Sequence, residues 1–342
     1  MYDLLRSLLF RLPPEIAHDL SLSAIDLAST LNLAGSLAKV PDDPVRLWNL
    51  EFPNPVGLAA GLDKSGDHFN GLGRLGFGFI EIGTVTPRAQ PGNPAPRVFR
   101  LPEYEAIINR MGFNNRGVDH LVTRVRRRDY GGVLGINIGK NAATPVENAV
   151  DDYVIGIDRV YPYADYVAIN ISSPNTAGLR SLQHGDELEA LLETMKARQA
   201  ALSDEHDKDV PLLVKIAPDL TDAEIVDIAA IVRRVGIDGV IATNTTIARD
   251  AVAGHRYAGE AGGLSGAPVR AASTHVIATL YAELGDDTPI IGVGGITDGA
   301  SAVEKIEAGA RLVQIYTGFI YHGPPLIAAA VRAIAGARRG AS

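Results

Sequence analysis

Eight short apolar or β-branched segments recur after residue 55, and patterns typical of amphipathic helices separate them. Strands that alternate with helices form parallel sheets, because each helix carries the chain back to the edge where the previous strand began. Eight such units are the number that closes a (β/α)8 barrel. The sequence therefore predicts an α/β fold of the TIM-barrel type, with strands at 56–59, 79–83, 133–137, 166–170, 212–216, 239–243, 289–293 and 312–315.

The main alternative is a doubly wound open sheet, which needs a glycine-rich turn directly after its first strand. Gly57 and Gly61, followed by Asp63 and Lys64, do not match the spacing of that turn. At 342 residues the chain also has the length of one large barrel domain. We therefore favour the barrel.

Composition excludes several classes of function. The net charge is -8 with acidic and basic residues intermixed, so nothing indicates a nucleic-acid surface. The chain has no cysteine, which rules out disulfides, a thiolate nucleophile and cysteine-ligated zinc or iron–sulfur clusters. Few carboxylates and no histidine stand at the ends of the predicted strands, so we expect no metal centre.

Two amphipathic helices are predicted ahead of the barrel, on either side of Pro13 and Pro14. Their apolar positions are Leu4, Leu5, Leu8, Leu9 and Leu12 in the first helix, and Ile16, Leu20, Leu27 and Leu31 in the second. Charged residues interrupt both stripes, so neither forms the run of about 20 apolar residues that a membrane span needs. The two helices either cap the barrel or lie in a membrane interface.

Functional residues of such barrels gather at the carboxyl ends of the strands. Six of the eight predicted ends carry an amide, a hydroxyl or a lysine. The richest segment is 170–176, whose amides and hydroxyls suit a flat polar heterocycle. Its Ser173 could accept a proton if neighbouring groups assist it. The pattern indicates a planar ligand held by neutral hydrogen bonds and a few cations.

Two glycine-rich segments, 292–295 and 316–318, follow the last two strands, where barrels usually bind phosphate. Lys215 lies inside an apolar strand, where an unpaired ammonium is costly. It either forms a structural ion pair or stabilises negative charge on an electron-accepting ring. Lys64, in a loop at the predicted barrel mouth, is a candidate for binding an anion.

Two long inserts interrupt the alternation, at 84–118 and 246–267. The first is too long for a strand-to-helix loop without structure of its own. We expect it to form a small hairpin over the barrel mouth.

Ten segments, taken in order, resemble the dihydroorotate dehydrogenases, specifically the class 2, quinone-linked branch. They are 57–64, 82–88, 109–115, 135–140, 170–176, 214–219, 242–246, 262–266, 291–295 and 314–319. The resemblance covers nearly the whole chain, including the N-terminal helices. It implies oxidation of (S)-dihydroorotate to orotate in de novo pyrimidine (UMP) biosynthesis, with FMN as the cofactor and a membrane quinone as the final electron acceptor.

The resemblance also implies residue roles. Ser173 takes the C5 proton of the substrate while C6 gives a hydride to the flavin, whereas class 1 enzymes carry a cysteine at that position. The implied substrate contacts are Lys64, Asn109, Arg110, Met111, Gly112, Phe113, Asn170, Asn175, Asn244 and Thr245. The implied FMN contacts are Ala60, Gly61, Leu62, Asp63, Lys64, Thr84, Asn137, Asn170, Lys215, Thr243, Gly266, Gly295, Tyr316 and Thr317.

The same resemblance divides the chain into two units. Residues 1–40 become a helical segment for membrane binding and quinone access, and residues 41–342 become the FMN-binding barrel. We expect a monomer attached peripherally to the cytoplasmic face of the bacterial cell membrane, with a lipid surface and no nucleic acid as a partner.

Three other functions stay open on the residues alone. A dihydropyrimidine or dihydrouridine oxidoreductase would commonly use a cysteine base, which is absent here. A lyase or isomerase acting on a sugar phosphate would share the phosphate loops but would need a catalytic carboxylate or a Schiff-base lysine. A membrane-binding module without catalysis would leave the polar barrel mouth unexplained.

Overall fold

The computed structural model describes residues 2–31 and 39–340 and contains a closed barrel of eight parallel strands that follow one another in chain order. The barrel strands are β3 (Val56–Leu58), β4 (Phe79–Val85), β7 (Val133–Ile138), β8 (Tyr166–Asn170), β9 (Leu212–Ile216), β10 (Gly239–Ala242), β12 (Ile290–Val293) and β13 (Leu312–Ile315). Each lies within two residues of its predicted position. The predicted (β/α)8 fold is confirmed.

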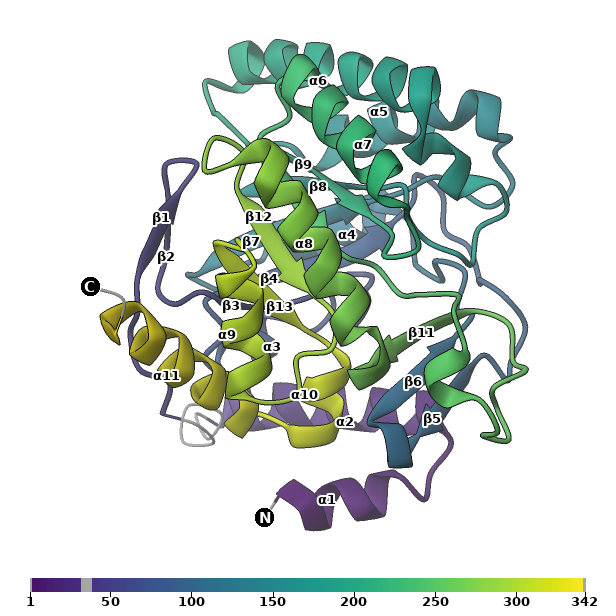
Figure 1. Ribbon diagram of the computed structural model, residues 1–342, viewed down its shortest axis with the longest axis vertical. Coiled ribbons are helices and arrows are strands. Elements are labelled where there is room, and N and C mark those ends of the chain that lie inside the picture. Colours follow the sequence, from purple (N-terminus) through teal and green to yellow (C-terminus); the bar gives the residue numbers. More distant parts are fainter. Residues whose placement is uncertain (1, 32–38, 341–342) are drawn as a thin grey trace.

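Helices surround the barrel and bury its outer face (Figure 1). They are α3 (Phe69–Gly73), α4 (Val118–Val125), α5 (Ala149–Val160), α6 (Gly185–His206), α7 (Asp222–Val235), α8 (Arg270–Leu284), α9 (Gly299–Glu307), α10 (Thr317–His322) and α11 (Pro325–Gly340). Local sequence sets their ends. At α7, for example, Thr221 and Glu224 form a capping box, and Gly236 ends the helix with φ +77°.

A short hairpin closes the amino end of the barrel, and the sequence did not predict it. Its strands are β1 (Val45–Leu47) and β2 (Leu50–Phe52). The ring of Phe52 packs edge-on against Phe79, with 5.3 Å between centroids. Trp48, between the two strands, donates a hydrogen bond to the carbonyl oxygen of Asp238 (2.6 Å). This apolar plug fills the amino end of the barrel interior.

A three-stranded antiparallel sheet stands beside the barrel mouth. It consists of β5 (Val98–Leu101), β6 (Ala106–Asn109) and β11 (Gly263–Gly266), with β6 in the centre. The first two strands are the hairpin expected in the first insert. The third comes from the second insert, for which the sequence predicted no strand. The sheet joins the two inserts into one wall.

The N-terminal helices, α1 (Tyr2–Leu9) and α2 (Pro14–Thr30), lie at the end of the molecule that carries α10 and β5 (Figure 1). Tyr2 donates a hydrogen bond to the carbonyl oxygen of Ile320 (2.7 Å), and Glu15 pairs with Arg97 of the first insert (2.8 Å). Among the described residues, no helix is both long and apolar enough to cross a bilayer. The expected boundary at residue 40 follows residues 32–38, which lie outside the described part of the chain.

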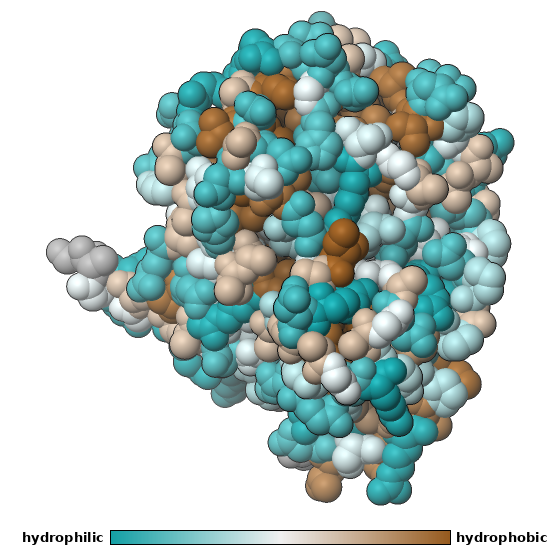
Figure 2. Space-filling view, turned by 45° about the vertical axis from the view of Figure 1, so that its right-hand side comes forward, coloured by the Kyte–Doolittle hydropathy of each residue, from teal (hydrophilic) through white to brown (hydrophobic). Residues whose placement is uncertain are grey.

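Most leucines of these helices face outward, although Leu22 of α2 is buried against the core. Leu4, Leu5 and Leu8 of α1 are 74%, 52% and 60% exposed, and Leu20 and Leu27 of α2 are exposed as well. Brown, hydrophobic side chains accordingly reach the surface at the lower end of the molecule in Figure 2. The two helices therefore present apolar side chains to solvent at this end of the molecule.

Candidate active site

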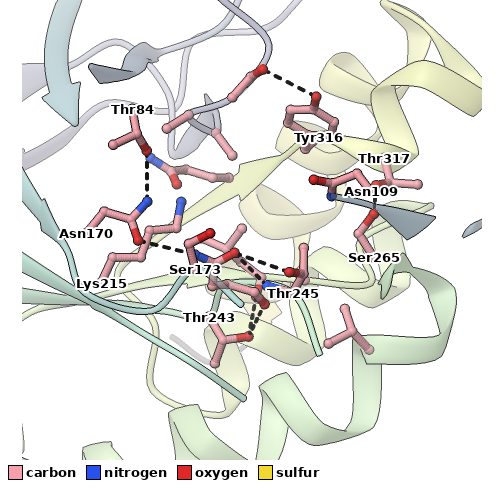
Figure 3. Close-up of a pocket in the computed structure, with 18 of the residues that line it drawn as sticks. Thr84, Asn109, Asn170, Ser173, Lys215, Thr243, Thr245, Ser265, Tyr316 and Thr317 are labelled. Carbon is pink, nitrogen blue, oxygen red and sulfur yellow. Dashed lines mark hydrogen bonds between the residues drawn. The ribbon is translucent and has the colours of Figure 1, made fainter. Parts of the chain in front are cut away.

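One cavity opens at the carboxyl end of the barrel strands and encloses about 990 Å³, including its open mouth. Residues at the ends of seven barrel strands and from both inserts line it, and Figure 3 shows several of their side chains around the cavity. The structure brings most of the predicted site residues to its wall: Ala60, Gly61, Lys64, Thr84, Asn109, Met111, Gly112, Phe113, Asn170, Ser173, Asn175, Lys215, Thr243, Asn244, Thr245, Gly266, Gly295, Tyr316 and Thr317.

Four predicted residues do not line the cavity. Leu62 packs into the apolar core between the barrel and the helices. The carboxylate of Asp63 turns back to accept two backbone hydrogen bonds within its own loop (2.8 and 2.9 Å). Arg110 points outward and pairs with Glu260 (2.6 Å). The fourth, Asn137, lies beneath the floor of the cavity.

Buried hydrogen bonds fix the polar floor. The side-chain oxygen of Asn137 accepts from the hydroxyl of Thr84 (2.5 Å) and the amide of Asn170 (3.2 Å). Its own amide donates to Glu81 (2.8 Å), while Asn170 also donates to Thr84 (2.8 Å). Because every donor faces an acceptor, the orientation of these side chains is set by the protein alone.

Lys215 faces a buried carboxylate. Its ammonium lies 3.7 Å from Glu81, too far for a hydrogen bond, and it donates no hydrogen bond to any other described residue. Glu81 also accepts from the hydroxyl of Tyr166 (2.8 Å) and the amide of Gln314 (2.7 Å), and burial together with this carboxylate raises the pKa of Tyr166 well above 10. The ion pair considered from sequence is therefore present, yet the protons of Lys215 stay free for a ligand.

Backbone N–H groups line one end of the cavity. Gly294, Gly295 and Ile296 line it, and their three consecutive N–H groups donate no hydrogen bond within the described residues. Gly294 and Gly295 have φ values of +123° and +73°, which favour glycine. Beside them the hydroxyls of Ser265 and Thr317 lie 2.8 Å apart. Free amides next to hydroxyls suit an anion with several oxygens, such as a phosphate.

At the opposite end stands the loop that follows β8. The hydroxyl oxygen of the buried Ser173 accepts a hydrogen bond from the backbone N–H of Asn175 (3.2 Å), and the side chain of Asn175 donates to Asn109 (3.2 Å). The side-chain oxygens of Asn175 and Thr176 are buried and have no partner among the described residues. Buried polar atoms usually have a hydrogen-bond partner, so these two oxygens are available to a ligand or a water.

Lys64 brings a positive charge whose pKa is unusually low. Its ammonium donates to the carbonyl oxygen of Gly61 (2.7 Å) at the cavity wall. Burial, and then the nearby guanidinium of Arg97, lower the pKa of Lys64 from 10.5 to about 8. The side chain is therefore mostly charged at neutral pH and loses that charge in mildly alkaline solution.

Sequence reasoning assigned no role to four polar groups of this region: the side chains of Glu81, Gln314 and Ser265, and the backbone N–H of Ile296. Glu81 and Gln314 could have been found from the sequence, because each is a polar residue inside an apolar strand, as Lys215 is. Ser265 and the amide of Ile296 could not. A closed barrel with a polar mouth and a lysine–carboxylate pair at its floor defines the class as an α/β-barrel protein that binds a polar ligand at the carboxyl ends of its strands.

Comparison with known proteins gives the family. The family model described as dihydroorotate dehydrogenase matches residues 44–336. The chain is 64% identical to a dihydroorotate dehydrogenase (quinone) of Marinobacter nauticus and 61% identical to that of Cellvibrio japonicus; these alignments cover 98% and 99% of this chain and 98% and 100% of the relatives. The crystal structure of a DHODH from Eimeria tenella in complex with ferulenol has a TM-score of 0.86 at 39% identity, covering 96% of this chain and 92% of that one.

The chain belongs to the dihydroorotate dehydrogenase family, in its quinone-dependent branch. The resemblance found in the sequence is thereby confirmed.

Proposed function

We propose that this chain oxidises (S)-dihydroorotate to orotate in its barrel mouth and delivers the electrons to a membrane quinone, in de novo pyrimidine (UMP) biosynthesis. One observation carries the proposal: a single cavity has Ser173, Asn109, Asn175 and Asn244 at one end and, at the other, three backbone amides that donate no hydrogen bond among the described residues, with Asn170 and Lys215 side by side on its floor. The first set suits a pyrimidine, and the second suits a phosphorylated planar cofactor.

FMN fits the second set. The amides of residues 294–296 and the hydroxyl of Thr317 would hold the phosphate, and Lys215, Thr84 and Asn170 would face the ring. When bound, FMN supplies the ring that accepts a hydride from C6 of the substrate. Lys215, with its protons free, stabilises the negative charge that arrives with the electrons.

The remaining residues suit dihydroorotate. A pyrimidine-dione edge alternates hydrogen-bond donors and acceptors, and a carboxamide offers both. The asparagines of the cavity wall are Asn109, Asn170, Asn175 and Asn244. Lys64 supplies a cation for the substrate carboxylate. These contacts orient C5 toward Ser173, whose hydroxyl oxygen takes the C5 proton.

Serine is a weak base and needs a route for the proton. The buried hydroxyl of Thr176, without a partner among the described residues, suits a water that carries the proton onward. As Ser173 takes the C5 proton, its own hydroxyl proton passes to this water and on to solvent, so Ser173 is again a neutral hydroxyl before the product leaves.

A comparison of electron acceptors tests this function. We expect the purified protein to oxidise dihydroorotate with a lipophilic quinone and to show little activity with fumarate or NAD. Turnover that depends on fumarate or NAD, with none on quinone, would overturn the proposal.

Replacing Lys215 by alanine is expected to lower the reduction potential of the bound FMN or to weaken its binding about tenfold, because the cation facing the reduced ring is lost. Potentiometric titration and flavin occupancy measure both effects. The single change leaves the buried carboxylate of Glu81 without its ion-pair partner. The paired variant Lys215→Met with Glu81→Gln removes both charges and is therefore the control for stability. Unchanged potential and occupancy in both variants would make Lys215 purely structural.

Raising the pH is expected to weaken binding of orotate, because deprotonation of Lys64 removes the positive charge that faces the ligand's carboxylate. The free protein should bind orotate with constant affinity well below pH 8, the approximate pKa of Lys64. Above that pH the dissociation constant should rise about tenfold per pH unit. Spectral titration of the oxidised flavoprotein measures this without the chemical step, and Lys64→Met should bind weakly at every pH.

The N-terminal helices support a peripheral membrane site for quinone. We propose that residues 1–40 place their exposed leucines in the lipid interface, at the cytoplasmic face of the bacterial cell membrane, while residues 41–342 form the catalytic unit. The chain acts as a monomer in this arrangement. Glu15 of α2 contacts Arg97, which also lies near Lys64, so the helices reach to the edge of the cavity.

A further inference from the structure

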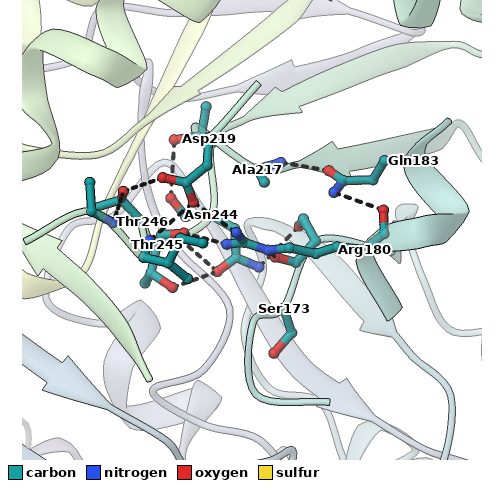
Figure 4. A network of polar contacts seen from close by, with 12 residues as sticks. Ser173, Arg180, Gln183, Ala217, Asp219, Asn244, Thr245 and Thr246 are labelled. Atoms are coloured by element: carbon teal, nitrogen blue, oxygen red, sulfur yellow. Dashed lines mark hydrogen bonds and ion pairs between the residues drawn. The ribbon is translucent and has the colours of Figure 1, made fainter. Parts of the chain in front are cut away.

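Arg180 binds three chain segments at once, and the catalytic proposal does not use it. It belongs to the 3-10 helix η4 (Leu179–Gln183) that follows the Ser173 loop. Its guanidinium donates to the carbonyl oxygen of Ser172 (3.0 Å), the carboxylate of Asp219 (2.7 Å) and the carbonyl oxygen of Thr245 (2.8 Å). These acceptors follow β8, β9 and β10, three neighbouring strands (Figure 4).

The surroundings of this guanidinium are themselves fixed. Asp219 accepts the hydroxyl of Thr246, and its other oxygen accepts the backbone N–H of Ile247 (3.1 Å). At the far end of η4, the buried side chain of Gln183 accepts the backbone N–H of Ala217 (2.8 Å). The helical turn that carries the arginine is therefore anchored to the segment after β9, and the arginine is not free to move away from the loops that it joins.

Two of its partners border the substrate end of the cavity. Ser172 directly precedes Ser173, and Thr245 directly follows Asn244. The side chain of Asn244 also donates to the hydroxyl of Ser172 (3.0 Å), which closes the same two loops against each other. The guanidinium thus holds the wall that carries the base against the wall that binds the pyrimidine, without lining the cavity itself.

We infer that Arg180 is a positioning residue that sets the distance between Ser173 and the bound substrate for transfer of the C5 proton. This role rests on the proposed function, in which Ser173 is the base. An arginine suits it because its planar group offers five N–H donors in a fixed fork, whereas a lysine offers a single centre. The three acceptors each meet a different nitrogen atom of Arg180, so a single ammonium nitrogen in its place would not lie within hydrogen-bond distance of all of them.

The test separates the two half-reactions of the FMN-loaded protein. In Arg180→Ala, and nearly as much in Arg180→Lys, we expect flavin reduction by dihydroorotate to slow about tenfold to hundredfold, since a small misplacement of a reacting group costs this much. FMN occupancy and reoxidation by quinone should change less than about twofold. Arg234→Ala is the matched control, because it removes a two-bond pair with Glu189 (2.6 and 2.6 Å) on exposed helix faces.

A double variant shows whether Arg180 acts through Ser173. Adding Arg180→Ala to Ser173→Ala should slow reduction little beyond the single serine variant, because residues that act as a unit are not additive. Normal flavin reduction in Arg180→Ala, equal slowing of both half-reactions, or rate losses that multiply in the double variant would each overturn the inference. Normal reduction in Ser173→Ala would instead refute the base assignment itself, so the two failures are distinct.

Discussion

Replacing Ser173 by alanine is expected to leave FMN bound and to slow flavin reduction by dihydroorotate by about 10²–10⁴-fold, the usual cost of losing a general base. The hydroxyl is buried and accepts only one hydrogen bond, from the backbone of Asn175 (3.2 Å), so its removal leaves the loop intact. Stopped-flow absorbance of the flavin, after anaerobic mixing with dihydroorotate, measures the rate.

A nearby serine outside the cavity provides the control. Ser181 is exposed and donates to the carbonyl oxygen of Gly178 (2.8 Å), at the surface of the same segment. Ser181→Ala should reduce its flavin at the normal rate. Near-normal reduction in Ser173→Ala would show that another group takes the C5 proton.

Replacing Leu4, Leu5 and Leu8 together by glutamine is expected to lower partitioning onto lipid vesicles at least 100-fold. Full burial of one leucine contributes about 1.5–3 kcal/mol, so even partial burial of three supplies the few kcal/mol that this factor requires. The rate of flavin reoxidation by a long-chain quinone should fall together with vesicle binding, while the rate of flavin reduction by dihydroorotate stays normal. Vesicle co-sedimentation and stopped-flow kinetics give the two readouts.

This substitution is sharper than removal of residues 1–40, because the hydrogen bond of Tyr2 to Ile320 and the pair of Glu15 with Arg97 remain. Ile155→Gln on α5 is the matched control, since Ile155 is 46% exposed on a helix outside the N-terminal segment. Full vesicle binding and full quinone turnover in the triple variant would show that the helices only cap the barrel.

The fold was largely predictable because a parallel barrel strand is buried on both faces and reads as an apolar run. The β1–β2 hairpin escaped prediction for the opposite reason. Its strands have three residues each and carry the exposed Arg46 and Glu51, so no periodicity could distinguish them from a loop. Only contact with Phe79 and Tyr166 inside the barrel makes the hairpin a plug.

The site was predictable where one residue carried its own signal. Lys215 stood out as a charge inside an apolar strand, but its partner Glu81 lies on β4, which is separated from β9 by two other strands of the barrel. Sequence does not show which inward side chains meet across a barrel. The sequence analysis did not single out Arg180, because its acceptors lie 8, 39 and 65 residues away along the chain.

The N-terminal helices show a different limit of prediction from sequence. Their leucine stripes were visible, but a stripe does not say what it faces. In the structure, α2 turns Ala17 and Leu22 inward and leaves Leu20 and Leu27 exposed, so part of the apolar stripe is open to a further partner. A lipid surface is the partner that we propose.

A single anaerobic turnover tests the central claim most directly. The purified protein should be yellow and should release FMN on denaturation, identified by mass. One equivalent of dihydroorotate per flavin should bleach the colour and yield one equivalent of orotate, and a lipophilic quinone should then restore the colour. A protein that carries no flavin, or whose flavin stays oxidised in the presence of dihydroorotate, would contradict the account.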